Sequence, residues 1–174
     1  TGDGDCLGIG GNHFIHAARR NVDMTVVMVN NYIYGMTGGQ VAPTTPLDMP
    51  TKTTPYGNSD RPFDAVKLAI GAGATFVARH SVPYPRLLDR DLKKAILHRG
   101  FSFIEVVAQC PTQSGRIMYG SSEPAVLFDE IKKRSVTGKE QPLAPDQFAI
   151  GVLHEDRERK PYEPSRPRGE ERKS

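Results

Sequence analysis

The sequence has little of several features that would assign it to a class of protein at once. It has no tryptophan, and its two cysteines, Cys6 and Cys110, are too few for a disulfide framework, which favours a reducing, cytoplasmic setting. No apolar run approaches the roughly 18 residues of a membrane span, so a transmembrane protein is not expected. The formal net charge is only +3, which argues against a polycationic nucleic-acid binder.

What the chain does have is a modest apolar fraction and an abrupt start. Hydrophobic residues make up 37% of its 174 residues, beside 17 Gly and 14 Pro, so we expect the core to be concentrated in part of the chain. A dense glycine motif, Thr1-Gly2-Asp3-Gly4-Asp5, opens the sequence. Such a loop normally follows a buried strand. We therefore expect the chain to be a portion of a larger domain that lacks its N-terminal part.

Apolar patterning predicts alternating strands and helices. Strands are expected over residues 24–29, 75–79, 101–107 and 147–153, and helices over 8–20, 62–71, 86–99 and 124–134. Residues 35–62 carry no such pattern and predict a long functional loop. The alternation indicates an α/β fold, a parallel sheet flanked by helices on both faces, over residues 1–153. The charged tail at 154–174 has seven Lys/Arg and six Asp/Glu, and we expect it to be disordered or bound along a partner.

Polar residues gather where the predicted strands end, which is where ligands bind in open α/β sheets. A glycine-rich loop that opens a helix presents backbone N–H groups to a phosphate. Asp3 would repel a bare phosphate, but it suits a divalent cation, and Asn31 lies 28 residues later at a neighbouring strand end. Asp5 could cap the new helix. Each motif alone is typical of a turn; their joint occurrence around a strand predicts a metal–phosphate site.

These residues resemble a known motif and a known family. Gly2-Asp3-Gly4 followed by Asn30-Asn31 resembles the thiamine-diphosphate-binding motif. The longer sequence around this motif is similar to the beta subunit of 2-oxoacid:ferredoxin oxidoreductases, in particular those acting on 2-oxoglutarate, over about residues 1–153. The stretches that carry the resemblance are Gly2–Asp5, Gly10–His13, Asn30–Gln40, Pro43–Pro46, Phe103–Val106 and Cys110–Thr112.

The resemblance implies a thiamine-diphosphate-binding fold and a set of ligands. Mg²⁺ would be held by the side chains of Asp3 and Asn31 and by the backbone carbonyl of Ile33. The cofactor would be contacted by Gly4, Asp5, Gly35 and Met36. Cys110 resembles one of four ligands of a [4Fe-4S] cluster. The other three family ligands lie upstream of the thiamine motif and are absent from this sequence, and Cys6 is expected to be structural.

The activity implied is the oxidative decarboxylation of a 2-oxoacid to an acyl-CoA, with electrons passed through the cluster to ferredoxin. In this family the glutamate that activates the cofactor comes from the alpha subunit, so no catalytic residue is expected on this chain. An alpha subunit, ferredoxin, the 2-oxoacid and coenzyme A are the implied partners, with no nucleic acid and no membrane. The substrate is expected to be 2-oxoglutarate, with branched-chain and pyruvate-type enzymes as alternatives.

Other interpretations remain open. Another thiamine-diphosphate-dependent decarboxylase or synthase would keep Asp3 and Asn31 but have no use for Cys110. A non-catalytic scaffold would use neither. His13 and His16 lie three residues apart in a predicted helix, but no further ligand is placed to complete a metal site with them, so ordinary helix positions are expected.

Overall fold

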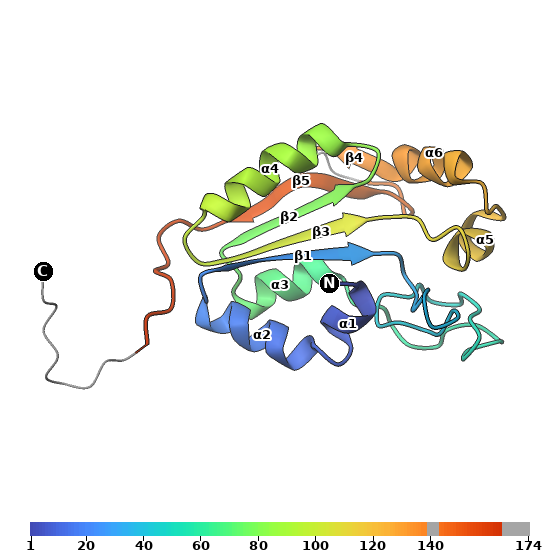
Figure 1. Cartoon of the computed structure of the whole chain (residues 1–174), viewed down its shortest axis with the longest axis horizontal. Helices are drawn as coiled ribbons and strands as arrows, with labels where there is room; N and C mark the ends of the chain where they lie inside the picture. The colour runs from blue at the N-terminus through green and yellow to red at the C-terminus, as the bar shows by residue number, and fades with distance from the viewer. Residues whose placement is uncertain (139–142, 165–174) are drawn as a thin grey trace, which may run out of the picture.

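The computed structural model describes residues 1–138 and 143–164, and its centre is a five-stranded sheet. Across the sheet, the strands are β1 (Met24–Asn30), β3 (Phe101–Val107), β2 (Phe76–Ser81), β5 (Phe148–Glu155) and β4 (Ser135–Thr137) (Figure 1). The first three run parallel, and β5 is antiparallel to β2. The expected α/β fold with a mostly parallel sheet is therefore confirmed.

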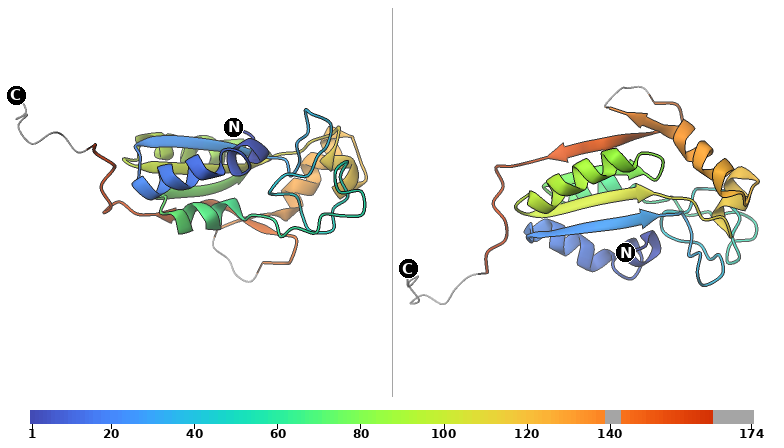
Figure 2. Two further views of the ribbon diagram at one scale, coloured as in Figure 1. Left: turned by 90° about the horizontal axis from the view of Figure 1, so that it is seen from below. Right: turned by 45° about the horizontal axis from the view of Figure 1, so that its top comes forward.

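Helices cover both faces of this sheet. Figure 1 and Figure 2 show α1 (Asp3–Leu7), α2 (Gly11–Arg20) and α3 (Ala65–Ala72) on one face and α4 (Pro85–Leu97) on the other. Two more helices, α5 (Ser114–Tyr119) and α6 (Pro124–Arg134), lie at the end of the sheet where β3 finishes. In the described part of the chain, no helix is both long enough and apolar enough to cross a membrane.

The two faces bury separate apolar clusters. Under α2 and α3, the ring of Phe14 meets those of Phe101 and Phe103 edge-to-face, with centroids 5.7 and 5.0 Å apart. Under α4, residues such as Phe76 and Ile104 from the other face of the same strands pack against Ala95. Apolar residues on both faces of the central strands explain why their sequences are continuous hydrophobic runs.

A long segment at the carboxyl end of the parallel strands forms the functional loop. Residues 31–64 contain no helix or extended strand and fold back over the ends of β1 and β3, on the same side as α5 (Figure 1). This segment begins directly after β1 and ends at Asp64, whose carboxylate caps α3 by accepting from the backbone N–H groups of Val66 and Lys67 at 3.2 and 3.3 Å. The loop predicted at 35–62 therefore lies where the sheet presents its ligand-binding edge.

Three details differ from the sequence prediction. The helix expected over 8–20 is α2, which begins only at Gly11; a separate short helix, α1, precedes it, and Gly10 between them donates its N–H to the Asp5 carbonyl at 2.8 Å. β5 runs against β2, because the chain reaches β5 from α6 and β4 at the carboxyl end of the sheet and must return from there. The short elements α5 and β4 were not predicted.

The part of the tail that the structure describes lies along the chain itself. β5 continues to Glu155, two residues beyond the predicted domain boundary. After it, Tyr162 donates its backbone N–H to the Asn21 carbonyl at 2.8 Å, and the Asn21 side chain donates to the Lys160 carbonyl at 2.9 Å. Disorder or a partner was expected from residue 154, whereas residues 156–162 pack on the C-terminal end of α2. Residues 165–174 lie outside the described residues.

Candidate functional site at the carboxyl edge of the sheet

Asp3 is a buried carboxylate at the start of α1. Thr1 and Gly2 pair with the end of β1, where Val29 donates its N–H to the Thr1 carbonyl at 2.9 Å, and this pairing places Asp3 beside the residues that follow β1. Its side chain is 2% exposed; Oδ2 accepts from the Thr44 hydroxyl, and Oδ1 lies 3.5 Å from the Asn31 backbone nitrogen. Burial raises the pKa of Asp3, although the bonds from Thr44 and Asn31 oppose that rise.

Asn31 and Ile33 lie in a tight reversal of the chain directly after β1. The Asn31 side-chain oxygen accepts from the Ile33 backbone N–H at 3.2 Å, and Tyr32 between them has a φ of 66°, in the left-handed region. Among the described residues, no backbone or side-chain donor bonds to the Ile33 carbonyl. The structure thus brings Asp3, Asn31 and Ile33 together, as the predicted metal site requires; their role as ligands remains a prediction.

Gly4 and Gly35 lie at places where a side chain would collide with the site. A β-carbon on Gly4 would lie 2.3 Å from the ring of Tyr34, whose hydroxyl donates to the Gly4 carbonyl at 2.8 Å. A β-carbon on Gly35 would lie 3.1 Å from the Cys110 sulfur and 3.7 Å from the Asn31 amide nitrogen. Gly35 is therefore the point where the loop after β1 meets both the predicted metal site and the predicted cluster ligand.

Asp5 and Met36 lie on the surface of the same edge. Met36 is fully exposed, and Asp5 is exposed on α1. The proposal that Asp5 caps the new helix is wrong, because Gly2 is the N-cap of α1 and Asp5 falls inside its first turn. A contact between either side chain and a cofactor remains a prediction.

The two cysteines have different surroundings. Cys110 follows β3 and is 8% exposed, packed with Ile33 and Met49, and its sulfur lies 3.5 Å from the Thr112 hydroxyl. Cys6 lies within the core under α1, where burial raises its thiol pKa to about 11. A thiol with such a pKa stays protonated and unreactive near neutral pH. Cys6 thus has the surroundings of a structural residue, and Cys110 lies against the loop that carries the predicted metal site.

The histidines of α2 do not form a metal site in the described structure. His13 and His16 are exposed, and the Arg19 Nε donates to His16 Nδ1 at 3.4 Å. Over residues 1–138 and 143–164, no group of three or more His, Cys, Asp or Glu side chains is placed to hold a metal. A cation at Asp3 would therefore take its remaining ligands from amide and carbonyl oxygens and from a phosphate, as Mg²⁺ commonly does.

A charged hydrogen-bond network lies directly behind the residues of the predicted metal site, and the sequence patterns did not predict it. On the face covered by α3, the Arg79 Nε donates to Glu105 at 2.6 Å and its Nη2 to Asp64 at 2.8 Å. Glu105 also accepts from the Asn30 side chain at 2.7 Å. We call these residues, Asn30, Glu105, Arg79 and Asp64, the Glu105 network. The signal available in the sequence was a charged residue inside each of two apolar strands.

Electrostatics favour the charged forms of Asp64 and Arg79 although both are partly buried. Burial alone would raise the pKa of Asp64, but the charge of Arg79 and the hydrogen bonds of the helix cap bring it below its usual value. Burial would likewise lower the pKa of Arg79, and the carboxylates of Glu105 and Asp64 outweigh this and raise it. The arginine therefore remains a cation between two carboxylates.

One hollow adjoins the site. It has a volume of about 440 Å³ and lies between Tyr34 and the loop residues that follow it. Its lining combines apolar and charged side chains: Tyr34, Val41, Ala42, Pro43, Asn58, Asp60, Arg61 and Phe63. Tyr34 lines this hollow and also packs on Gly4, so the hollow lies beside the glycine loop.

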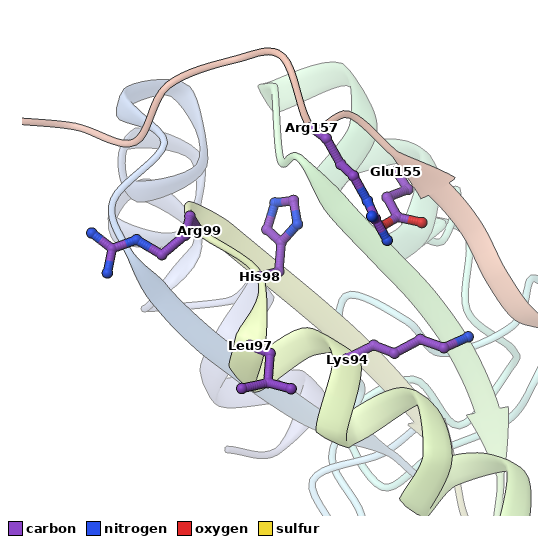
Figure 3. A pocket seen from close by; sticks show the side chains of 6 residues that line it. All are labelled: Lys94, Leu97, His98, Arg99, Glu155 and Arg157. Atoms are coloured by element: carbon purple, nitrogen blue, oxygen red, sulfur yellow. The ribbon is translucent and has the colours of Figure 1, made fainter.

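A second hollow, of about 420 Å³, lies at the opposite end of the sheet, between the end of α4 and the end of β5 (Figure 3). It is lined by Lys94, Leu97, His98, Arg99, Glu155 and Arg157. Each of its three strong cations pairs with a carboxylate: Lys94 with Asp91, Arg99 with Asp23 and Arg157 with Glu155, at 3.1, 3.2 and 2.6 Å. The predicted site residues lie far from it, so the carboxyl edge is the candidate site.

Comparison with known proteins identifies the family. Residues 1–106 match the model of the thiamine pyrophosphate enzyme, C-terminal TPP binding domain. The chain belongs to this family. The matched residues include the whole loop after β1 and all four residues of the Glu105 network.

Relatives of this TPP-binding domain agree with the resemblance seen in the sequence. The chain is 54% identical to the 2-oxoglutarate synthase subunit KorB of Methanocaldococcus jannaschii, over 78% of this chain and 50% of the relative. It is 33% identical to subunit beta of a 2-oxoacid:ferredoxin oxidoreductase 2 from Aeropyrum pernix, over 93% of this chain and 57% of the relative. The chain thus spans about half the length of the curated relatives it matches.

A solved structure has the same fold. The 2-oxoglutarate:ferredoxin oxidoreductase from Magnetococcus marinus, with 2-oxoglutarate, coenzyme A and succinyl-CoA bound, superposes with a TM-score of 0.77 at 29% identity. The match covers 91% of this chain and 56% of that one. The similarity to beta subunits of this enzyme family is confirmed by these relatives.

The residues at the carboxyl edge fit a metal-bound diphosphate. Asp3 is a buried carboxylate, and over the described residues no lysine, arginine or histidine forms an ion pair with it. Such a group is costly to ionise unless a cation neutralises it. A hard cation beside Asp3 could also reach the oxygens of Asn31 and Ile33, which are the donor types that Mg²⁺ prefers. The thiamine diphosphate of this family thus has a chemically suitable place here.

Proposed function

We propose that this chain is the thiamine-diphosphate-binding part of the beta subunit of a 2-oxoacid:ferredoxin oxidoreductase, and that its substrate is 2-oxoglutarate. The observation that carries the proposal is the position of Gly35, which lies against both Asn31 of the predicted metal loop and the sulfur of Cys110. An enzyme that passes electrons from a thiamine cofactor to an iron–sulfur cluster needs these two sites side by side. A thiamine enzyme without a cluster has no such need.

In this proposal Asp3, Asn31 and the Ile33 carbonyl would hold Mg²⁺ beside the diphosphate. Gly4 and Gly35 would contact the cofactor from the two loops, and Asp5 and Met36 from the surface. When bound there, Mg²⁺ would supply positive charge for the diphosphate. The fit of a cation to the buried Asp3 carboxylate supports this assignment.

Cys110 is proposed as one of four thiolate ligands of a [4Fe-4S] cluster. A cluster needs four such ligands, and the other cysteine of the sequence, Cys6, is packed in the core under α1, so the remaining three must come from outside these 174 residues. The position of Cys110 beyond the carboxyl end of β3, near the metal loop, supports the assignment. Both cysteines are free, which agrees with a reducing, cytoplasmic location.

The overall reaction converts a 2-oxoacid and coenzyme A into an acyl-CoA and CO₂ and passes an electron pair to ferredoxin. When bound, thiamine diphosphate supplies the nucleophilic carbon and the electron sink for decarboxylation. The residues of this chain would bind and orient the cofactor. Asp3 and Asn31 would hold the metal, and the Tyr34 hydroxyl fixes the glycine loop by donating to the Gly4 carbonyl. The acid that activates the cofactor comes, in this proposal, from an alpha subunit, so this chain alone is inactive.

The test uses the complete beta subunit assembled with its alpha partner. We expect the complex to contain iron and to reduce ferredoxin when 2-oxoglutarate, coenzyme A and thiamine diphosphate are all present. Pyruvate and a branched-chain 2-oxoacid are assayed in parallel, and faster turnover of either would change the substrate assignment. A complex without iron would overturn the ferredoxin proposal in favour of another thiamine decarboxylase or synthase. A complex that binds no thiamine diphosphate would indicate a scaffold.

A further inference from the structure

The Glu105 network is placed to control the shape of the metal loop. β3 is flanked by β1 and β2, and Asn30, Glu105 and Arg79 project from these three strands onto one face of the sheet. Glu105 is 3% exposed and Asn30 is 3% exposed, so water does not compete for their contact. At this end of the face, charged groups replace the phenylalanines that fill the core below α2 and α3.

The contact with Glu105 fixes which way the Asn30 amide points. The Glu105 carboxylate, which also pairs with Arg79, accepts from the Asn30 amide, so the amide nitrogen faces it. The Asn30 oxygen then points the other way and accepts from the Tyr32 backbone N–H at 3.0 Å. An amide in the reverse orientation would set its oxygen against Glu105 Oε1 and leave the Tyr32 N–H without an acceptor.

The bond to Tyr32 sets the backbone from which the metal ligands project. Tyr32 holds a φ of 66°, which is unfavourable for a residue with a β-carbon and needs support from its surroundings. The Asn30 oxygen holds its N–H, and the Thr45 hydroxyl donates to its carbonyl at 2.7 Å. Asn31 and Ile33 lie on either side of Tyr32, and the Asn31 backbone nitrogen lies 3.5 Å from Asp3 Oδ1, so the place of both residues depends on this backbone.

Arg79 gives this arrangement a rigid base. Its guanidinium joins Glu105 on β3 to Asp64, the N-cap of α3, so the carboxylate that faces Asn30 is held by two further elements. Groups that orient metal ligands in this way commonly change metal affinity 10- to 100-fold when they are replaced.

We propose that Glu105 is a positioning residue for Mg²⁺-dependent binding of the cofactor diphosphate, acting through Asn30 on the loop that carries Asn31 and Ile33. The inference rests on the proposed function, because it assumes the metal at Asp3. It goes beyond that function by assigning separate tasks to two adjacent asparagines. Asn31 faces the metal, and Asn30 faces the protein and sets the loop.

The test measures how bound thiamine diphosphate depends on Mg²⁺ concentration in the assembled complex, by equilibrium dialysis. We expect Glu105→Gln to raise the Mg²⁺ concentration for half-maximal binding at least about 10-fold. The Asn30→Asp variant tests the same contact from the loop side, should Glu105→Gln fail to assemble. It sets two carboxylates against each other, and we expect a shift of the same size.

The double variant Asn30→Asp/Glu105→Gln separates positioning from general stability. It exchanges amide and carboxylate, so one hydrogen bond can form in the reverse sense, the Tyr32 N–H keeps an acceptor and the net charge is unchanged. We expect it to recover most of the Mg²⁺ affinity that either single variant loses. Asp91→Asn is the matched control. It alters a buried carboxylate on the α4 face that pairs with Lys94, so it should lower the unfolding temperature without moving the Mg²⁺ dependence.

The outcomes are distinguishable. If wild type shows Mg²⁺-dependent binding and Glu105→Gln shows the same dependence, the inference is overturned and the proposed function stands. A double variant that recovers nothing also overturns the inference. A wild-type complex that binds no thiamine diphosphate with Mg²⁺ overturns the proposed function and this inference together.

Discussion

Asp3 shows how burial and ligand binding make opposite demands on one side chain. Its pKa is raised by burial, so above the ordinary value of 3.8 the folded state holds a proton more tightly than the unfolded chain. The contribution of Asp3 to stability therefore decreases as pH rises from 3.8 through the raised pKa, and it stays unfavourable at neutral pH without a cation. A buried carboxylate that lowers the stability of the fold at neutral pH is typical of a residue with a binding or catalytic role.

Replacing Asp3 by Asn should separate stability from function. In the complete subunit without Mg²⁺ at neutral pH, we expect Asp3→Asn to unfold at the same or a higher temperature than wild type, because the variant has no charge to bury. Mg²⁺ with thiamine diphosphate should then raise the unfolding temperature of wild type only. Thermal unfolding with and without the two ligands measures both effects. A metal-free variant clearly less stable than wild type would contradict the account.

Gly35 allows a second test at the scale of one residue. An alanine there would bring a β-carbon to 3.1 Å from the Cys110 sulfur, so the sulfur must move by a few tenths of an ångström. We expect Gly35→Ala to alter the electron paramagnetic resonance spectrum of the reduced cluster in the assembled complex. Gly71→Ala is the control, because a β-carbon there meets nothing within 4 Å. An unchanged spectrum for Gly35→Ala would argue against Cys110 as a ligand.

At the scale of elements, the sequence predicted what depends on local pattern. The apolar runs at β1 and β3 and the periodic residues of α4 and α6 gave these elements within two residues of their ends. The antiparallel direction of β5 was not predicted, since it depends on the end of the sheet at which the chain leaves α6. The elements α5 and β4 have six and three residues, too few for a period to be recognised.

The same distinction holds for the site. The sequence was enough to predict that Asp3 and Asn31 lie close together. Asp3 follows the residues that pair with the end of β1, and Asn31 directly follows β1. The Glu105 network could not, because its contacts join residues 75 and 26 positions apart, and only the strand order β1-β3-β2 brings them together. The sequence contained the charged residues, but their partners depend on register.

A buried histidine on the face of the sheet covered by α4 predicts that the stability of the fold depends on pH. His80 on β2 is fully buried, with its Nε2 3.3 Å from Asp91 on α4; burial lowers its pKa below 6.5, although Asp91 opposes this. Below pH 6.5 the unfolded chain therefore binds a proton that the folded chain resists, and stability falls as pH decreases. We expect His80→Gln to flatten this fall between about pH 6.5 and 5.

Urea unfolding of the complete subunit at several pH values measures this slope. His13→Gln is the control, because His13 is exposed on α2 and should leave the slope as in wild type. A slope that is equally steep in His80→Gln would show that other groups cause the pH dependence.

At the scale of the whole molecule, the two ends of the sheet have different tasks. The carboxyl edge carries the loop, Cys110 and the proposed cofactor site, and the opposite end is closed by the segment after β5 (Figure 1). There the Arg159 guanidinium donates to the Gly73 carbonyl at 2.6 Å and also to the Arg19 carbonyl, so it caps the ends of α2 and α3 together. The tail thus stabilises the fold at a distance from the site.

Removing this cap should loosen the tail without affecting the cofactor. We expect Arg159→Ala to speed hydrogen exchange in residues 156–164 several-fold, because the Tyr162 N–H that bonds to Asn21 is then less protected. Arg157→Ala is the matched control, since that side chain pairs only with Glu155 among the described residues. Mass spectrometry of the exchanged peptides checks the result, and equal protection in both variants would contradict it.

The central claim is that this chain holds thiamine diphosphate through a metal at Asp3 and Asn31. The most direct measurement is calorimetric titration of thiamine diphosphate into the assembled complex, with Mg²⁺ or with a chelator, for wild type and Asn31→Ala. We expect saturable binding that requires Mg²⁺ in wild type and is lost in the variant. Binding that is equally tight with the chelator, or unchanged in Asn31→Ala, would contradict it.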